Sequence, residues 1–370
     1  MRTKAAVVRE INQLTIEEVN LDPPQPYEVL VRMQAAGICH SDLHTYRGEL
    51  RAMPPLVLGH EGAGIVEAVG ADVTKVKPGD RILVNWLPSC NQCPACLRGQ
   101  NNLCTRLPAT TLQALLPDGT TRLSTLDGVR LKHYLSAATM AEYAVVDEAS
   151  AIKLPEDVPF AVASIIGCAV LTGTGAVLNT AQVPAGSSAA VIGCGGVGLS
   201  AIMGCRLAGC YPIIAVDVME SKFDFARELG ATHTINARST DAIAALRELT
   251  AGGPDYVFDS VGAAATIDQA LKGVRPGGTA VIMGMHSMKA DVPISPAVLI
   301  AMNKRLLGSF AGSARPHLDL PHFIELYRSG RLPVDKLVSK RYTLEELTTA
   351  FADMEAGKVA RGVILFDGSR

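Results

Sequence analysis

Apolar and amphipathic segments alternate along the middle of the chain. Apolar runs of strand length occur at 189–192, 212–217, 255–259 and 278–284, and the segment THTI at 232–235 is also strand-like. Stretches with helical spacing lie between them, at 221–229, 241–251 and 265–272. The first of these stretches ends at Gly230, a residue suited to a helix C-terminus. This alternation predicts a doubly wound α/β fold, a parallel sheet with helices on both faces.

The segments on either side follow a different pattern. The first 150 residues are rich in Val, Gly and Pro and contain short alternating runs, such as YEVLVRM at 27–33 and GAGIVEAVG at 62–70. These runs predict a mainly β domain. After the central region, the pattern predicts a helix near 318–329, a helix that begins with a capping box at Thr343 and Glu346, and a terminal strand at 362–366.

One long stretch, from Val158 to Cys205, carries no charged residue. A helix that spans a membrane needs about 20 consecutive, mostly apolar residues. Here Thr, Asn, Gln, Ser, Pro184 and many glycines interrupt the stretch. It therefore predicts a buried strand and packed helices, and we expect no association with a membrane.

The composition narrows the possible partners and the compartment. The 370 residues allow two domains with full cores, and 34 basic residues against 36 acidic ones leave a net charge of −2. No basic patch stands out, which argues against a nucleic-acid partner. The N-terminal residues MRTKAAVVREINQ show neither a long apolar run nor a cleavage signature. We therefore expect no signal peptide and a reducing, cytoplasmic location.

Four of the nine cysteines lie within fifteen residues: Cys90, Cys93, Cys96 and Cys104. In a reducing compartment, this C-x2-C-x2-C-x7-C spacing indicates a tetrahedral metal site, most simply zinc. The alternatives are a redox pair or four incidental thiols. Four thiolates would fill the coordination sphere and leave no position for a substrate, so the predicted site is structural.

Gly193, Gly195 and Gly198 form a G-x-G-x-x-G motif between the apolar run at 189–192 and the next predicted helix. Asp217 ends the following strand, 19 residues beyond Gly198. Such glycines let a backbone and a helix N-terminus approach a pyrophosphate, and the acid favours NAD over NADP because it accepts hydrogen bonds from the ribose. The alternative is a glycine-rich packing element.

A second metal site is possible away from the cysteine cluster. Cys39 and His60 lie 21 residues apart and Cys168 lies in an apolar context much further along, so no local motif joins them, and each alone is most simply a packing residue. Together they would form a Cys2His site with one open position, the pattern of a catalytic zinc. Asp42 is a candidate acceptor for the second ring nitrogen of His60, and Glu61 adjoins the ligand.

These motifs together resemble the zinc-dependent medium-chain alcohol dehydrogenase family, within the medium-chain dehydrogenase/reductase superfamily. The resemblance is carried by the four-cysteine lobe, GHEGAG at 59–64, GGVGLSAIMGC at 195–205 and AVD at 215–217, and it runs nearly end to end. It implies a mainly-β, GroES-like catalytic domain at 1–169 and 310–370, with a zinc lobe at 89–105. A Rossmann NAD-binding domain at 170–309 would be inserted into it.

The resemblance also implies cofactors and residue roles. It implies two zinc ions per chain, one catalytic on Cys39, His60 and Cys168 and one structural, and NAD. Ser41 and His44 resemble the family's proton relay. The implied cofactor contacts are His40, Thr172, Gly193, Gly195, Gly196, Val197, Gly198, Asp217, Lys222, Ala311 and Arg361. The implied substrate pocket contains Trp86, Tyr134, Leu135, Met285 and Phe310.

Each of these roles has a plain structural alternative. Ser41 and Thr172 would serve equally as cap or turn hydroxyls, Trp86 as a core residue, and Lys222 and Arg361 as solvated surface charges. The remaining histidines are assigned no role: His133, His233, His286, His317 and His322.

The activity that the resemblance implies is the reversible NAD-linked oxidation of alcohols, with primary aliphatic or aromatic alcohols expected. The close alternative is a glutathione-dependent formaldehyde dehydrogenase, because the region 107–143, with PDGTTRLSTLDG, is similar to that branch. Against it, Pro108 stands where that branch has an arginine, and His44 where it commonly has a tyrosine. A polyol dehydrogenase would usually replace Cys168 with glutamate. A non-catalytic zinc- or nucleotide-binding module is a remote alternative. The long segment between Cys104 and Tyr143 resembles the dimeric branch, so we expect a homodimer rather than a tetramer.

Overall fold

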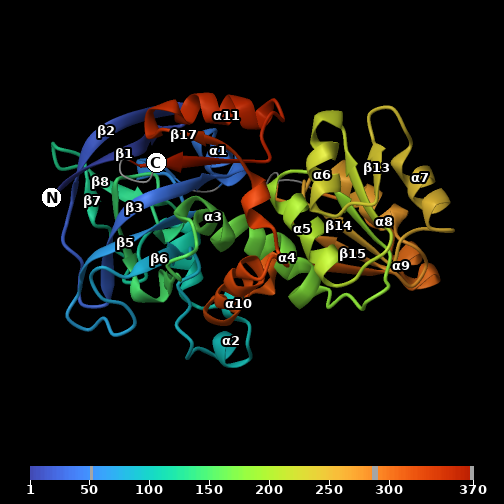
Figure 1. Cartoon of the computed structure of the whole chain (residues 1–370), viewed down its shortest axis with the longest axis horizontal. Coiled ribbons are helices and arrows are strands. Elements are labelled where there is room, and N and C mark those ends of the chain that lie inside the picture. The colour runs from blue at the N-terminus through green and yellow to red at the C-terminus, as the bar shows by residue number, and fades with distance from the viewer. Residues whose placement is uncertain (51–52, 286–290, 367–370) are drawn as a thin grey trace. The chain divides into compact units, whose positions relative to one another are not determined.

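The computed structural model describes residues 1–50, 53–285 and 291–366, so His286 lies outside the described residues. The chain forms two compact units (Figure 1). The first consists of Met1–Cys168, Arg315–Arg328 and Val338–Arg370, and the second of Ala169–Ala314 and Ser329–Leu337. Both units therefore contain segments that are far apart in the sequence.

The first unit is built on two β systems. A closed barrel has the strand order β1-β2-β7-β8-β4, and its strands are β1 Arg2–Glu10, β2 Gln13–Leu21, β4 Leu56–Val57, β7 Leu123–Ser124 and β8 Arg130–His133. A second sheet has the order β10-β6-β5-β3-β18-β17, and β9 pairs with β3 off this path. Its strands are β3 Glu28–Ile38, β5 Gly62–Val69, β6 Arg81–Val84, β9 Tyr143–Asp147, β10 Ala151–Lys153, β17 Val338–Tyr342 and β18 Arg361–Leu365.

Strand β3 lies at the centre of the first unit. It pairs with β5, β9 and β18, and its alternating residues Val29, Val31 and Met33 are at most 1% exposed. The predicted mainly β, GroES-like fold is thereby confirmed. The helices of this unit are α1 His40–Tyr46, α2 Pro94–Leu97, α3 Phe160–Ile165, α10 Pro316–Arg328 and α11 Leu347–Glu355.

The second unit contains the predicted parallel sheet, in the order β13-β12-β11-β14-β15-β16. The strands are β11 Ala189–Ile192, β12 Ile213–Asp217, β13 His233–Asn236, β14 Tyr256–Asp259, β15 Thr279–Ile282 and β16 Arg305–Gly308. Numbered within this unit, the order is 3-2-1-4-5-6, which is the arrangement that binds dinucleotides. The strand order reverses beside β11, where such folds place their ligand.

Helices flank the strands of this sheet, with α5 and α6 packed together and α7 and α8 packed together (Figure 1). The helices of the unit are α4 Leu171–Gly175, α5 Gly196–Leu207, α6 Phe223–Leu229, α7 Ala242–Leu249, α8 Ala264–Gly273 and α9 Pro296–Met302. The predicted Rossmann fold is therefore confirmed. The end of α6 is also as predicted, because its C-cap Gly230 has a φ of +127°.

The uncharged stretch contains a helix over Phe160–Thr180 that is long and apolar enough to cross a membrane by length and composition alone. However, 83% of its most apolar window is buried inside the protein. Its hydropathy is therefore that of a core helix. Two of its segments, Ile166–Val170 and Ala176–Thr180, are π-helical turns, and such turns are frequent at functional sites.

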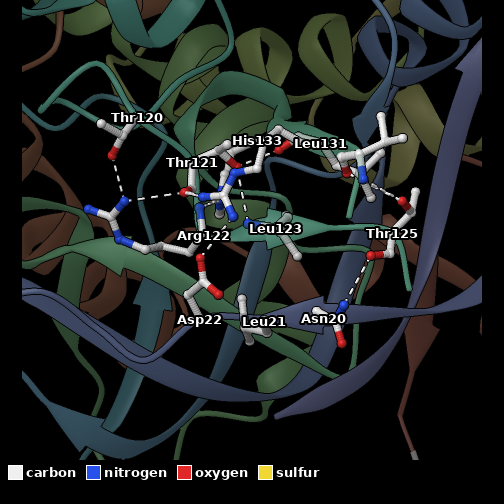
Figure 2. A network of polar contacts seen from close by, with 12 residues as sticks. Asn20, Leu21, Asp22, Thr120, Thr121, Arg122, Leu123, Thr125, Leu131 and His133 are labelled. Atoms are coloured by element: carbon white, nitrogen blue, oxygen red, sulfur yellow. Dashed lines mark hydrogen bonds and ion pairs between the residues drawn. The ribbon is translucent and has the colours of Figure 1, made fainter. Parts of the chain in front are cut away.

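A buried polar network ties the β7–β8 hairpin to the start of β3, and Figure 2 shows the part of it around Arg122 and His133. The guanidinium of Arg122 donates to both carboxylate oxygens of Glu28 at 2.8 Å and to Asp118 Oδ2 at 2.5 Å. The backbone N–H of Arg122 donates to His133 Nε2 at 3.1 Å. His133 is fully buried, and its Nδ1 has no hydrogen-bond partner within the described part of the chain. The ring of His133 is therefore neutral, and its Nε2 lone pair accepts the Arg122 N–H.

Candidate metal and cofactor sites

Three segments of the first unit bring Cys39, His60, Glu61 and Cys168 together. Cys39 is the N-cap of α1, directly after β3, and Cys168 lies in the π-helical turn Ile166–Val170. The donor atoms of these four residues all lie within 4.8 Å of one another, and all four residues are buried. Cys168 Sγ is 3.3 Å from His60 Nε2. The predicted Cys2His set is thus a single cluster, although its members are up to 129 positions apart in the sequence.

Asp42 fixes the orientation of two members of this cluster. Its Oδ1 is 3.3 Å from His60 Nδ1 and accepts the Gly59 N–H at 3.1 Å, while Oδ2 accepts the Cys39 N–H at 3.2 Å. Asp42 is 0% exposed. Because the carboxylate occupies Nδ1, His60 presents Nε2 to the thiols, as a metal-ligating histidine does.

Two aromatic rings pack edge-on against the imidazole of His60. The ring centroid of Tyr134 is 5.4 Å from that of His60, and the Trp86 ring lies at 6.3 Å. The Tyr134 hydroxyl donates to the backbone carbonyl of Ser41 at 3.0 Å. Tyr134 therefore contacts both the proposed ligand His60 and helix α1. From the sequence, Tyr134 was predicted only as a residue of the apolar substrate pocket, and these contacts were not predicted.

Behind the thiols lies a buried ion pair between Glu61 and Arg361. The Arg361 guanidinium donates to Glu61 Oε2, and the two residues are 0% and 4% exposed. Burial raises the pKa of Glu61 to about 7, although the charge of Arg361 opposes this shift. Among the described residues, Glu61 Oε1 has no hydrogen-bond partner, so a buried oxygen within the cluster remains available to a cation.

The chemistry of the cluster fits zinc. Two sulfurs bound at 2.3 Å to one tetrahedral ion lie about 3.8 Å apart, and mixed S and N ligands are typical of this metal. A hydrogen bond from the Cys168 thiol lowers the pKa of Cys39, and the same contact raises the pKa of Cys168. The protein alone thus favours one thiolate and one thiol, and a divalent cation would hold both as thiolates.

The four-cysteine lobe forms a second cluster, with all four sulfurs within 4.8 Å of one another. Cys104 Sγ lies 3.6 Å from Cys90 Sγ and 4.0 Å from Cys93 Sγ, close to the separation expected around zinc. Backbone N–H groups donate to the sulfurs, from Cys93 to Cys90 Sγ and from Cys90 to Cys104 Sγ, both at 3.3 Å. Hydrogen bonds from the Cys96 and Thr105 backbone lower the pKa of Cys93 to about 5, which favours the thiolate form that binds a metal.

The predicted relay residues lie on α1, beside the first cluster. Ser41 Oγ is 3.6 Å from Cys39 Sγ. His44 follows one turn later, and its ring centroid is 6.1 Å from that of His40, which is exposed. Ser41 therefore adjoins the cluster, while His44 is further along the helix and retains a side-chain exposure of 16%.

The glycine-rich motif of the second unit forms a tight turn between β11 and α5. A Cβ at Gly198 would lie 1.8 Å from the carbonyl oxygen of Gly193, so only glycine fits there. Gly195 is the N-cap of α5, and a Cβ at this position would meet no atom of the described residues within 4 Å. The space above the helix N-terminus is therefore open to a ligand.

Asp217 stands at the carboxyl end of β12, beside this turn. Its Oδ2 accepts the Cys194 N–H at 2.7 Å, and Oδ1 accepts the Met219 N–H at 2.9 Å. Lys222 Nζ lies 3.3 Å from Asp217 Oδ2. The carboxylate is thus held at the position that contacts a cofactor ribose in this fold.

The remaining predicted residues are distributed over both units. Thr172 is on α4, Val197 on α5, and Ala311 adopts a φ of +49° in the turn Phe310–Ser313. Of the predicted pocket, Trp86, Tyr134 and Leu135 belong to the first unit, and Met285 and Phe310 belong to the second. Met285 is 52% exposed and Phe310 is 38% exposed. Arg361, predicted to contact a pyrophosphate, is in this structure the buried partner of Glu61, and the cofactor role stays a prediction.

Two family models match the chain. The model described as "Alcohol dehydrogenase GroES-like domain" matches residues 25–156, and the model described as "Zinc-binding dehydrogenase" matches residues 196–329. An alcohol dehydrogenase class-3 of Cereibacter sphaeroides is 40% identical over 99% of this chain and 100% of the relative. An S-(hydroxymethyl)glutathione dehydrogenase of Paracoccus denitrificans is 39% identical with the same coverage.

Solved structures give the same result for the fold. The crystal structure of an alcohol dehydrogenase zinc-binding domain protein from Burkholderia ambifaria has a TM-score of 0.94 and 35% identity, and covers 99% of both chains. A benzyl alcohol dehydrogenase from Acinetobacter calcoaceticus has a TM-score of 0.93 and 31% identity, with the same coverage.

Proposed function

The chain belongs to the zinc-dependent medium-chain alcohol dehydrogenase family and oxidises alcohols with NAD, and we propose that its substrates are primary alcohols with an aliphatic or aromatic group. The observation that carries the proposal is the buried cluster of Cys39, His60 and Cys168 beside Trp86 and Tyr134. Apolar and aromatic walls suit an uncharged alcohol, and benzyl alcohol is the substrate named for one structural neighbour.

Each unit has a proposed part in the reaction. Zinc bound by this cluster would supply a Lewis acid that lowers the pKa of an alcohol hydroxyl, and NAD bound at the glycine-rich turn would supply the hydride acceptor. In the first unit, the Ser41 hydroxyl accepts the alcohol proton as it gives up its own, and His44 is the outer group that releases a proton to solvent. In the second unit, Asp217 holds the cofactor ribose.

The rival substrate is S-(hydroxymethyl)glutathione, which is named for a relative at 39% identity. Its glutathione moiety carries two carboxylates, which need cationic partners on the protein. The turn Pro108–Leu112 has none: its sequence is PATTL, and Pro108 is exposed. The neighbouring Arg106 lies 3.7 Å from Asp147, a carboxylate that already neutralises its charge. These residues favour the simple alcohol.

A comparison of kcat/KM values decides between the two substrates. We expect benzyl alcohol and 1-butanol to be oxidised with higher kcat/KM than S-(hydroxymethyl)glutathione. The variant Pro108→Arg should raise kcat/KM for the glutathione adduct by roughly tenfold, the value of one charge-assisted hydrogen bond, and leave benzyl alcohol nearly unchanged. Preference of the wild type for the adduct would overturn the substrate proposal while leaving the family assignment intact.

The assembly proposed is a homodimer joined through the second unit. Strand β16 ends the described sheet, with β15 on one side and no described strand on the other. The neighbouring helix α9 exposes Ile300 by 80%, Met302 by 45% and Val298 by 40%. An open strand edge beside exposed apolar side chains is a natural pairing surface for a second copy. Sedimentation of the wild type and of Ile300→Asp measures the oligomeric state directly, and a monomeric wild type would contradict the proposed homodimer.

The compartment proposed is the cytoplasm. The cysteines of both clusters are free thiols in the described structure, and their role as ligands requires a reducing environment.

A further inference from the structure

Helix α1 ends in a Schellman motif centred on Gly48. The Gly48 N–H donates to the Thr45 carbonyl at 3.0 Å, and the Glu49 N–H donates to the His44 carbonyl at 2.8 Å. Gly48 has a φ of +73°, as this motif requires at its C′ position. The motif folds the chain back so that the residue after the glycine lies against the residue five positions earlier. The backbone alone therefore places Glu49 beside His44.

The side chains of these two residues form an ion pair. His44 Nδ1 and Glu49 Oε2 are hydrogen-bonding partners, with side-chain exposures of 16% and 41%. In a Schellman motif the same two positions frequently carry a hydrophobic contact. Here an imidazole and a carboxylate occupy them instead, on a helix that also carries Cys39 at its N-cap and Ser41 in its first turn.

A carboxylate at Nδ1 determines what the other ring nitrogen can do. In the neutral ring, Nδ1–H donates to Glu49, so Nε2 keeps its lone pair and faces away from the carboxylate as a proton acceptor. The tautomer of the ring therefore depends on Glu49 remaining in place.

Other charged groups surround this pair and must be considered. His40 lies on the same helix, with its ring centroid 6.1 Å from that of His44. Arg47, at the helix C-cap, is paired with Glu355 of α11 at 2.6 Å. Asp42, within the first turn, is committed to His60, Gly59 and Cys39. Glu355 is therefore a carboxylate on the same surface that pairs with arginine rather than with His44.

We propose that Glu49 is a positioning residue that holds His44 Nδ1 and thereby sets the orientation and the tautomer of the outer relay group. The inference rests on the proposed role of His44 in proton release. It goes further, because it assigns a function to a carboxylate outside both metal clusters and outside the cofactor turn.

The first test is the pH profile of alcohol oxidation, with C1-deuterated benzyl alcohol used to identify conditions where hydride transfer limits the rate. Glu49→Gln should lower the plateau by roughly three- to tenfold, a fraction of a typical general-base contribution. The double variant His44→Gln/Glu49→Gln should match His44→Gln alone.

Glu355→Gln is the matched control, since it removes the same charge from the same surface and leaves His44 untouched. It should reproduce the wild-type profile. A Glu49→Gln profile that coincides with the wild type or with Glu355→Gln would overturn the inference, provided that His44→Gln itself alters the profile. If His44→Gln also coincides with the wild type, the proposed relay is the part that fails.

The second test does not depend on activity. In protein labelled with 15N-histidine, the ring signals of His44, identified by their loss in His44→Gln, should show the Nδ1–H tautomer when the ring is neutral. Glu49→Gln should shift this ring toward the Nε2–H tautomer, and Glu355→Gln should not. A wild-type His44 in the Nε2–H tautomer would overturn the inference regardless of the kinetic result.

Discussion

Asp42 Oδ1 lies 3.3 Å from His60 Nδ1, and the other oxygen of the same carboxylate accepts the Cys39 N–H at 3.2 Å. One buried carboxylate therefore orients two proposed zinc ligands that come from different segments. Asp42 lies three residues after Cys39, so the first turn of α1 already brings the Asp42 carboxylate to the Cys39 N–H.

We expect Asp42→Asn to weaken the catalytic zinc site by roughly ten- to hundredfold in metal affinity, the usual cost of losing a group that supports a ligand. The amide keeps the shape of the carboxylate but loses its charge, and His60 loses its preferred acceptor. Zinc content measured after dialysis against a chelator should fall from two ions per chain toward one. Retention of both ions would show that the thiols alone hold the metal.

The two zinc sites should be separable by mutation. Cys104→Ala should remove one zinc and destabilise the fold, because a structural zinc contributes folding free energy directly. Cys168→Ala should abolish turnover and leave much of the stability, since Asp42 of α1 already holds Cys39 and Gly59 in place without the metal. Metal analysis combined with urea unfolding distinguishes the two variants. One zinc ion or none in the wild type would contradict both expectations.

Asp217→Gly should reduce the preference for NAD over NADP. The carboxylate accepts the Cys194 and Met219 N–H groups, and its removal frees Lys222, 3.3 Å away, to pair with a 2′-phosphate. The loss of a charge-assisted hydrogen bond to the ribose should lower NAD affinity by roughly ten- to hundredfold. Cofactor titrations with NAD and NADP measure the change. Equal use of both cofactors by the wild type would show that Asp217 only supports the turn.

The inner strands of the parallel sheet, β12, β11, β14 and β15, were predictable because they are mostly apolar and buried. The run at 189–192 gives the buried strand β11, and Asp241, at the start of the stretch 241–251, is the N-cap of α7. Strands β16 and β17 were not predicted, because both are short and largely exposed and neither alternates clearly between apolar and polar residues. The capping box at Thr343 is confirmed, although its first turn, Leu344–Glu346, is a 3-10 helix.

The candidate sites were predictable to different degrees. Four cysteines within fifteen residues predict a metal cluster from their spacing alone. Cys39, His60 and Cys168 come together only in the fold, so their cluster could be predicted only through the family resemblance. The pairing of Glu61 with Arg361, 300 positions apart, leaves no local pattern, and neither does the bond from Tyr134 to Ser41. In both cases the two partners meet through tertiary packing.

The buried His133 makes the first unit sensitive to acid. Burial, together with the charges of Arg122 and Arg130, lowers the pKa of His133 to about 3. Its ring accepts the Arg122 N–H (Figure 2), and no described residue is a hydrogen-bond partner of Nδ1 that could stabilise an added charge. Since an unfolded histidine has a pKa of about 6.5, the unfolded chain binds a proton that the folded one excludes. The stabilising contribution is therefore complete above about pH 6.5 and is lost as the pH falls from there toward 3.

We expect His133 to account for about 2 kcal/mol of the stability lost between pH 7 and pH 5, from the difference between the two pKa values. His133→Gln keeps an acceptor near the Arg122 N–H but cannot titrate. Its stability at pH 7 will differ from the wild type for packing reasons, so the informative quantity is the change between the two pH values. Urea unfolding should show a smaller pH-dependent loss for His133→Gln than for the wild type. His322→Gln, at an exposed position, should retain the wild-type loss. Equal losses in all three proteins would mean that carboxylates elsewhere dominate the acid response and that His133 is protonated without cost.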